Sequence, residues 1–159
     1  MRQLCLAAIL ALLAIPATAQ DARLLPFVGA WSGTGQAREG VNSPWESASC
    51  VIAIEWQRGL RSNGVCEGAR GRFSAGGVVN VDGETVAGDF MAPHFVQVAD
   101  SSVQIVGGAL VSHYTFEDGG QSFQFVLTVR RVGNQLEMTT EMLIDGRYQE
   151  VGRLTLTAD

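Results

Sequence analysis

The sequence contains no lysine, and this absence excludes several kinds of chemistry. All 11 cationic residues are arginines, against 16 acidic residues, and the formal net charge is −5. Without lysine there is no amine for a Schiff base, and without a basic block there is no clustered charge for nucleic acid phosphates. Arginine is therefore the one cation that an anionic ligand of this chain would meet.

Recognisable catalytic and metal-binding patterns are also missing. The chain has no Gly-x-Ser-x-Gly segment, no His-Glu-x-x-His segment and no glycine pair followed by a predicted helix. Its two histidines, His94 and His113, are isolated in the sequence, whereas a metal site usually takes three or four ligands at close spacing. We expect no catalytic residue, no metal and no resident cofactor, and we interpret both histidines as surface or rim residues.

Long apolar runs are confined to the N-terminus. Leu4–Ile15 is uninterrupted, and Ala17-Thr18-Ala19 has small residues where a signal peptidase cuts. The run is shorter than the ~20 residues of a spanning helix. We predict a secretory signal peptide over residues 1–19 and one domain over 20–159, with no transmembrane segment. The domain is then periplasmic or secreted, and a retained N-terminal anchor is the alternative.

Cysteines are scarce, and one of the three lies in the predicted leader. The remaining pair, Cys50 and Cys66, favours a disulfide in an oxidising compartment. The residues between them are predicted to form a hairpin, and a turn centred on Arg58 places the two cysteines directly opposite each other. A turn at Asn63-Gly64 is also favoured and would separate them. We predict the disulfide, and the second register stays open.

Apolar and polar residues alternate along most of the mature chain, which is typical of half-buried β-strands. Segment 123–129 places Phe, Phe, Leu and Val on one face, and segments 136–144 and 153–157 show the same period. Turn pairs that contain glycine separate these runs, at 76–77, 82–83, 107–108, 118–120, 133–134 and 145–146. Helical periodicity is limited to one turn at 22–27.

These strands predict an all-β fold. We expect a single antiparallel up-and-down β-barrel of about eight to ten strands, because closure removes exposed edges. A two-sheet β-sandwich is the alternative architecture. The longest polar connection, Ala37–Trp45, is expected to cap one end of the barrel.

The segment Gly29-Ala30-Trp31-Ser32-Gly33-Thr34-Gly35 resembles the first strand of calycin-type barrels, which include lipocalin-like and nitrobindin-like domains. The resemblance implies that Trp31 plugs the barrel base and that the glycines let the strand bend around it. It also implies that an arginine on a late strand covers the indole ring, a role that it assigns to Arg153. Haem binding in nitrobindin-like domains relies on a histidine near the chain end, a position at which this chain has none.

Large apolar side chains define the candidate ligand-binding site. These residues are Trp31, Trp56, Tyr114, Phe123, Phe125 and Met138. Aromatic and thioether walls suit an apolar ligand, although the same residues would also fill a small barrel. We hypothesise a non-catalytic extracytoplasmic barrel that binds a small hydrophobic molecule. The alternative is an inhibitor or a barrel that binds an envelope or secreted protein through its surface; haem binding and catalysis are less favoured.

The interior discriminates between these hypotheses. A connected apolar cavity above ~300 Å³ would favour the ligand carrier. A filled interior together with an exposed apolar patch would favour the protein-binding barrel.

Overall fold

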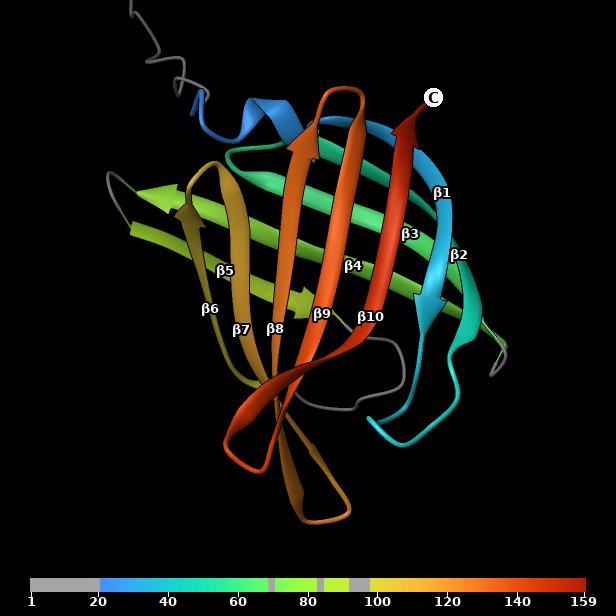
Figure 1. The fold of residues 1–159 in the computed structure, drawn as a ribbon. Coiled ribbons are helices and arrows are strands. Elements are labelled where there is room, and N and C mark those ends of the chain that lie inside the picture. Colours follow the sequence, from blue (N-terminus) through green and yellow to red (C-terminus); the bar gives the residue numbers. More distant parts are fainter. Residues whose placement is uncertain (1–20, 69–70, 83–84, 92–97) are drawn as a thin grey trace, which may run out of the picture.

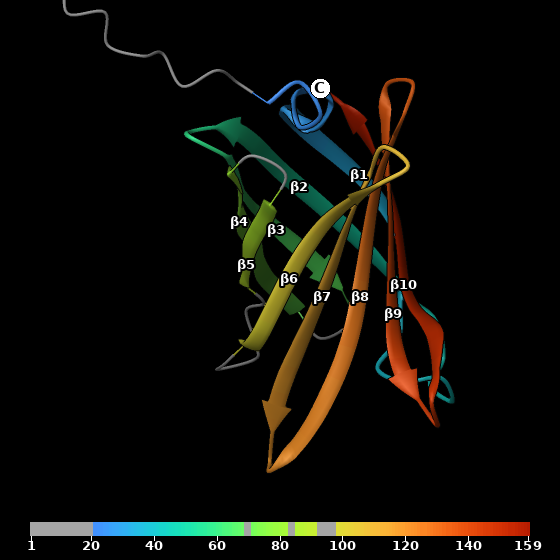
Figure 2. The ribbon, with the colours of Figure 1, turned by 90° about the vertical axis from the view of Figure 1, so that its left-hand side faces the viewer.

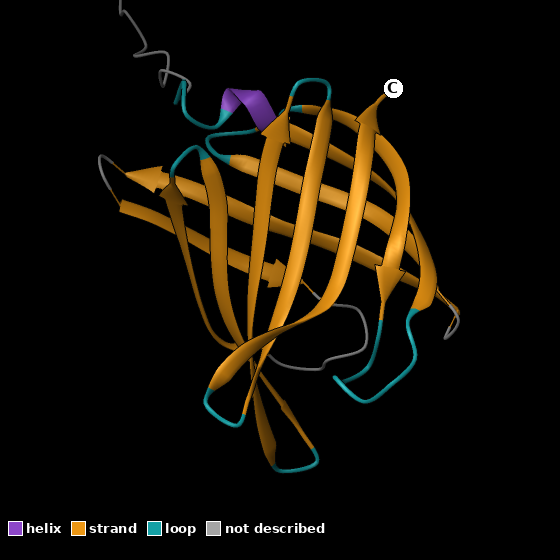
Figure 3. Ribbon diagram, viewed as in Figure 1, coloured by secondary structure: helices purple, strands orange, loops and turns teal. Residues whose placement is uncertain are grey.

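A computed structural model describes residues 21–68, 71–82, 85–91 and 98–159. The predicted leader, its cleavage site and His94 lie outside these residues. A 3₁₀ helix, η1 (Leu25–Phe27), precedes ten strands, which confirms the predicted fold class and number of strands (Figures 1 and 3). The strands are β1 (Gly29–Ala37), β2 (Glu46–Trp56), β3 (Leu60–Gly68), β4 (Gly71–Asp82), β5 (Thr85–Met91), β6 (Val98–Val106), β7 (Ala109–Asp118), β8 (Gln121–Val132), β9 (Gln135–Ile144) and β10 (Arg147–Ala158).

All ten strands belong to one antiparallel sheet. Its order is β5-β4-β3-β2-β1-β10-β9-β8-β7-β6, so consecutive strands pair as hairpins and β1 joins β10. The sheet curls until β7–β10 cross in front of β3–β5 (Figure 1), and the view turned by 90° shows the two halves edge-on (Figure 2). The up-and-down order is confirmed, and the two-sheet sandwich is wrong because a single sheet forms both walls.

The predicted closure of the barrel is wrong. Among the described residues no hydrogen-bonded ladder joins β5 to β6, although the two strands lie next to each other. Strand β5 contains Gly88, and a glycine inside a strand weakens its pairing. The unpaired boundary between β5 and β6 is termed the seam.

The turns of the sheet lie at its two ends. The end at which β1 begins, termed the η1 end, holds the turns at 57–59, 107–108 and 133–134 and the C-terminus (Figure 1). The connection 38–45 and the turns at 119–120 and 145–146 lie at the opposite end. Four of the predicted turns are thus confirmed. Gly83, part of another, lies outside the described residues.

Trp31 is completely buried beside η1. Its indole Nε1 donates a hydrogen bond to the main-chain oxygen of Phe27 at 3.0 Å, and Phe27 and Leu24 are themselves fully buried. The 3₁₀ helix therefore plugs the η1 end of the sheet, directly over the tryptophan. This arrangement agrees with the predicted helical turn before Trp31.

Strand β10 packs closely against β1 because two of the three glycines of β1 lie at the contact. The backbone of β10 passes so close to Gly33 and Gly35 that an added Cβ would overlap the main-chain oxygens of Thr155 and Arg153. Only glycine fits where another backbone approaches this closely. Gly33 and Gly35 thus allow β10 to pack closely against β1.

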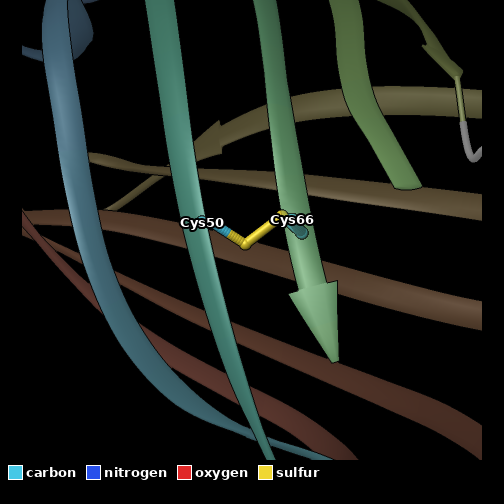
Figure 4. Close-up of a disulfide and its surroundings, with 2 residues drawn as sticks. All are labelled: Cys50 and Cys66. Carbon is cyan, nitrogen blue, oxygen red and sulfur yellow. A yellow bond between two sulfur atoms is a disulfide. The ribbon is translucent and has the colours of Figure 1, made fainter. Parts of the chain in front are cut away.

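The β2–β3 hairpin has the predicted register. Arg58 lies at its turn with a φ of 67°, and Cys50 faces Cys66. The two cysteines form a disulfide with Cα atoms 4.1 Å apart (Figure 4). Asn63-Gly64 lies inside β3, so the second register is wrong. Residues 76–77, predicted as a turn, lie inside β4, where Gly76 faces Asn63.

Candidate functional site

The inward faces of the strands surround an apolar cavity of about 90 Å³. Eight of the ten strands and η1 contribute described residues to its wall. The wall is mainly aliphatic, with Ile52, Ile54, Leu60, Val79, Leu110 and Leu127 among its members. A wall of this composition disfavours a bare charge, because its few polar groups would not replace the lost hydration.

Period-two alternation explains which residues reach the cavity. Along β7, Leu110, Ser112 and Tyr114 point inward and pair with the inward residues Val129, Leu127 and Phe125 of β8. Successive side chains of a strand point to opposite faces, so the intervening residues face outward. The cavity therefore lies between the inward faces of hairpins that are remote from each other in the sequence.

Three polar side chains at inward positions border the cavity: Ser62, Ser112 and Tyr114. The Ser62 hydroxyl donates to the main-chain oxygen of Gly77 at 3.3 Å. Burial raises the pKa of Tyr114, which keeps its phenol uncharged throughout the physiological range. The site thus has hydroxyl groups near an apolar space and no charge among these side chains.

Tyr114 belongs to a cluster of three aromatic rings. Its ring stacks on Phe125 with centroids 5.4 Å apart and meets the edge of Phe116 at 5.1 Å, while Phe116 and Phe125 lie edge to face at 5.5 Å. Such pairs contribute roughly 0.5–1.5 kcal/mol beyond the area that they bury. The cluster fixes the wall of the cavity on the side of β7 and β8.

Of the six residues predicted to bind a ligand, Tyr114 and Met138 border the cavity. Phe125 is an inward residue that packs in the aromatic cluster and is not among the described lining residues. The other three, Trp31, Trp56 and Phe123, occupy inward positions near strand ends and are not among the described lining residues. Their size suggested a role in binding, but their places along the strands put them beyond the cavity.

The aliphatic wall was missed because the prediction selected large side chains. Its signal is present in the sequence: Cys50, Ile52 and Ile54 alternate along β2, and all three are inward residues. Gly76 and Gly77, predicted as a turn, line the cavity within β4. An added Cβ at Gly76 would lie 2.7 Å from the main-chain oxygen of Ser62, so the glycine permits close approach of β3.

The arginine that covers Trp31 is Arg131, and the assignment to Arg153 is wrong. The Cζ atom of Arg131 lies 4.6 Å from the centre of the Trp31 ring. The same guanidinium donates hydrogen bonds to the main-chain oxygens of Pro26, at 2.9 Å, and of Gly133. Arg131 thus connects η1 to the β8–β9 hairpin over the buried tryptophan.

Strand alternation explains this correction. Leu154 and Leu156 are inward on β10, so Arg153 lies on the outer face, away from Trp31. On β8, Leu127 and Val129 line the cavity, and Arg131 occupies the next inward position. The resemblance supplied the correct contact type, whereas the alternation identifies the arginine.

Arg153 instead holds the connection 38–45 at the opposite end. The Cζ atoms of Arg38 and Arg153 lie 4.5 and 5.1 Å from the ring centre of Trp45. Arg38 also donates to the main-chain oxygen of Glu150, and Arg153 donates to Gln36 Oε1 at 2.8 Å. These contacts tie the connection to β10.

The histidine inside the described residues lies on the outer face of β7. His113 is exposed, and its ring centre is 6.5 Å from that of Tyr148, although the residue also borders the cavity. Within residues 21–159, outside the undescribed gaps, no three His, Cys, Asp or Glu side chains are grouped closely enough to hold a metal ion.

Comparisons of the chain with protein-family models, with curated proteins and with solved structures find no match. In the part of the chain that the structure describes, no helix has the length and apolar character needed to cross a membrane.

Proposed function

We propose that this protein is an exported, non-catalytic, lipocalin-like protein that holds a small apolar molecule inside its curled sheet. The observation that carries the proposal is the apolar cavity, which inward residues of both halves of the sheet enclose. Binding pockets combine a mainly hydrophobic wall with a few oriented polar groups. Ser112 and Tyr114 supply such groups beside the aliphatic wall.

The size of the cavity limits the ligand. Its 90 Å³ is below the ~300 Å³ expected of a ligand carrier, so the cavity in this conformation does not meet that expectation. It is also smaller than the ~150 Å³ cavity that accepts benzene in a protein core. The proposed ligand is therefore either a molecule of a few heavy atoms or the apolar group of a larger one, for which the cavity must widen.

The seam provides a route for widening. Gly77 and Val79 of β4 line the cavity on one side of the seam, and Val103 of β6 lines it on the other. Because no ladder joins β5 to β6 among the described residues, these walls can separate without the loss of ladder hydrogen bonds at that boundary. We propose that an apolar group reaches the cavity through the seam.

Native mass spectrometry of the protein recovered from its exported fraction tests the proposal directly. A retained apolar molecule is expected as added mass that disappears on denaturation. An apoprotein would be titrated calorimetrically with benzene, naphthalene and octanol. The absence of both a retained molecule and measurable binding would contradict the proposal. A co-purified protein, with no small molecule bound, would favour the protein-binding alternative.

A cavity-filling variant tests the location of the site. Ala75 lines the cavity, so Ala75→Leu adds apolar volume inside it, and we expect binding to weaken by about tenfold or more. Ala53→Leu adds the same side chain on the exposed outer face of β2 and is the matched control. Equal affinities of the two variants would place the ligand elsewhere.

A further inference from the structure

One buried side chain beside the cavity carries a polar group with no partner in the protein. Ser112 of β7 is 8% exposed and, apart from Tyr114, is the one polar residue buried in the described part of the chain. Buried hydroxyls in proteins usually form a hydrogen bond, because leaving one unmade costs free energy. A hydroxyl held at such a position without a partner points to a group that comes from outside the protein.

The residues around Ser112 leave its hydroxyl without a hydrogen bond. Its neighbours across the sheet are Val103 of β6 and Leu127 of β8, both aliphatic, buried and part of the cavity wall. Within the described residues no hydrogen bond involves the Ser112 side chain. By contrast, Ser62 of β3 donates its hydroxyl hydrogen to the main-chain oxygen of Gly77 at 3.3 Å. Ser112 thus keeps both its donor and its acceptor capacity.

The oxygen of Ser112 is open to the cavity. The described residues contain no enclosed side-chain nitrogen or oxygen atom that lacks a partner. Since the Ser112 oxygen lacks a partner, it is not enclosed, and the space that this buried residue lines is the cavity. The hydroxyl is therefore a hydrogen-bonding group presented to a mainly aliphatic space.

A hydroxyl in this position favours a neutral ligand that carries one oxygen atom. A serine hydroxyl both donates and accepts, and the hydroxyl of an alcohol does the same, so the two groups match. A charged head group is disfavoured, because one neutral hydroxyl does not replace the hydration of an ion. Burial also raises the pKa of the neighbouring Tyr114, which stays uncharged and offers no counter-charge.

The cavity volume sets the length of the carbon chain. A cavity of ~150 Å³ accepts the six carbons of benzene, so one of about 90 Å³ has room for roughly four heavy atoms. An unbranched alcohol of this size, such as 1-propanol, places its oxygen at one end and its carbon atoms along the aliphatic wall.

We infer that Ser112 is the polar anchor of the cavity and that the ligand is a short aliphatic alcohol, whose oxygen forms a hydrogen bond with the Ser112 hydroxyl. The carbon chain of the ligand contacts the aliphatic wall. This inference rests on the proposed function, since it names the class of molecule that the cavity holds. A site with one hydrogen-bonding group discriminates against an analogue that cannot form the bond.

NMR titration of the ligand-free protein with 1-propanol and 1-chloropropane tests the anchor. Chlorine takes the place of the ligand hydroxyl but donates no hydrogen bond. Ser112→Ala should weaken the binding of 1-propanol relative to that of 1-chloropropane by about fivefold. The two ligands differ in hydration, and this difference cancels when their affinity ratio is compared between the parent protein and the variant.

The matched control is Ser102→Ala, which removes the same hydroxyl at an exposed position of β6, opposite His113 on the outer face. It should keep the affinity ratio of the parent protein. Ser112→Thr retains a hydroxyl at the anchor position and should also keep that ratio, even where its added methyl group lowers both affinities. Loss of the ratio in Ser102→Ala to the same extent as in Ser112→Ala would overturn the inference.

Urea unfolding of the ligand-free variants distinguishes an anchor from a structural serine. Because the Ser112 hydroxyl has no partner in the protein, Ser112→Ala should leave the urea midpoint unchanged or raise it. A lowered midpoint would show that the hydroxyl stabilises the fold and would overturn the inference.

The ligand measurements separate this inference from the proposed function. If 1-chloropropane binds and Ser112→Ala leaves the affinity ratio unchanged, the inference is overturned and the proposed function stands. If neither three-carbon ligand binds but benzene does, the inference alone fails. If benzene, naphthalene and octanol also fail to bind, the proposed function fails with it.

Discussion

Replacement of Arg131 by methionine is expected to lower the free energy of unfolding by about 2 kcal/mol. The guanidinium lies 4.6 Å from the ring centre of Trp31, a contact that contributes roughly 0.5–1 kcal/mol. It also donates to the main-chain oxygens of Pro26 and Gly133, and a hydrogen bond from a charged donor contributes roughly 1.5 kcal/mol before partial exposure reduces it. Methionine keeps much of the apolar stem, so the loss reports mainly on the guanidinium.

The same substitution at Arg153 is the control. This side chain is 59% exposed, lies 5.1 Å from the ring centre of Trp45 and approaches Glu150 at 3.8 Å. Arg153 also donates one exposed hydrogen bond, to Gln36 Oε1 at 2.8 Å. The exposed ion pair, the exposed cation–π contact and this bond together contribute about 1–1.5 kcal/mol. Arg153→Met should therefore cost less than Arg131→Met.

Urea unfolding followed by circular dichroism and tryptophan fluorescence measures both variants. The comparison uses linear extrapolation and requires equal slopes, since a changed slope reports on a different unfolded state. A cost for Arg153→Met equal to or above that of Arg131→Met would refute the reasoning from strand alternation, because it would assign the stabilising contact to an outward residue.

Three further predictions concern the disulfide, the contact of β1 with β10 and the buried phenol. Cys50→Ala/Cys66→Ala should lower the free energy of unfolding by about 3 kcal/mol, because the bond closes a loop of about 15 residues in the unfolded chain; an unchanged urea midpoint would contradict this. Gly33→Ala should destabilise by more than about 2 kcal/mol, since its methyl overlaps the β10 backbone, whereas the exposed Thr34→Ala should be nearly neutral in the same urea assay. Burial raises the pKa of Tyr114 in the folded state, so its neutral phenol contributes to the free energy of unfolding below the unfolded-state pKa of about 10, and this contribution is lost as the pH rises above that value. In Tyr114→Phe the free energy of unfolding should therefore fall less between pH 8 and 11 than in the parent protein. An equal fall in both proteins would argue against burial as the cause.

Local sequence patterns were sufficient to predict features that depend on a single strand or a single hairpin. The Arg58 register could be predicted because a hairpin has one turn and because Cys50 and Cys66 meet only in that register. The same alternation that predicts the strands also identifies Arg131 as an inward residue. The assignment to Arg153 was wrong because it followed a family resemblance and not the two-residue alternation of inward and outward side chains.

Other features depend on neighbours that are distant in the sequence. Gly76 and Gly77 have the composition of a turn, and only the approach of Ser62 on β3 shows why a strand needs glycine there. Closure of the sheet likewise depends on whether the edges of β5 and β6 meet, which no local period encodes. The binding residues were predicted in part: Tyr114 and Met138 border the cavity, whereas Trp56 lies too near a strand end.

The strand pairs that are held by specific contacts lie away from the seam, and this bears on where a ligand could enter. The disulfide joins β2 to β3, and the backbone of β10 packs closely on β1 at Gly33. Arg131 of β8 donates a hydrogen bond to the main chain of Pro26 in η1. All three restraints lie on strands away from the seam. At the seam the described residues form no ladder, and adjacent β4 contains the cavity-lining pair Gly76-Gly77. A ligand larger than the 90 Å³ cavity would therefore displace the walls next to the seam at the least cost in hydrogen bonds, and the plugged η1 end would stay in place.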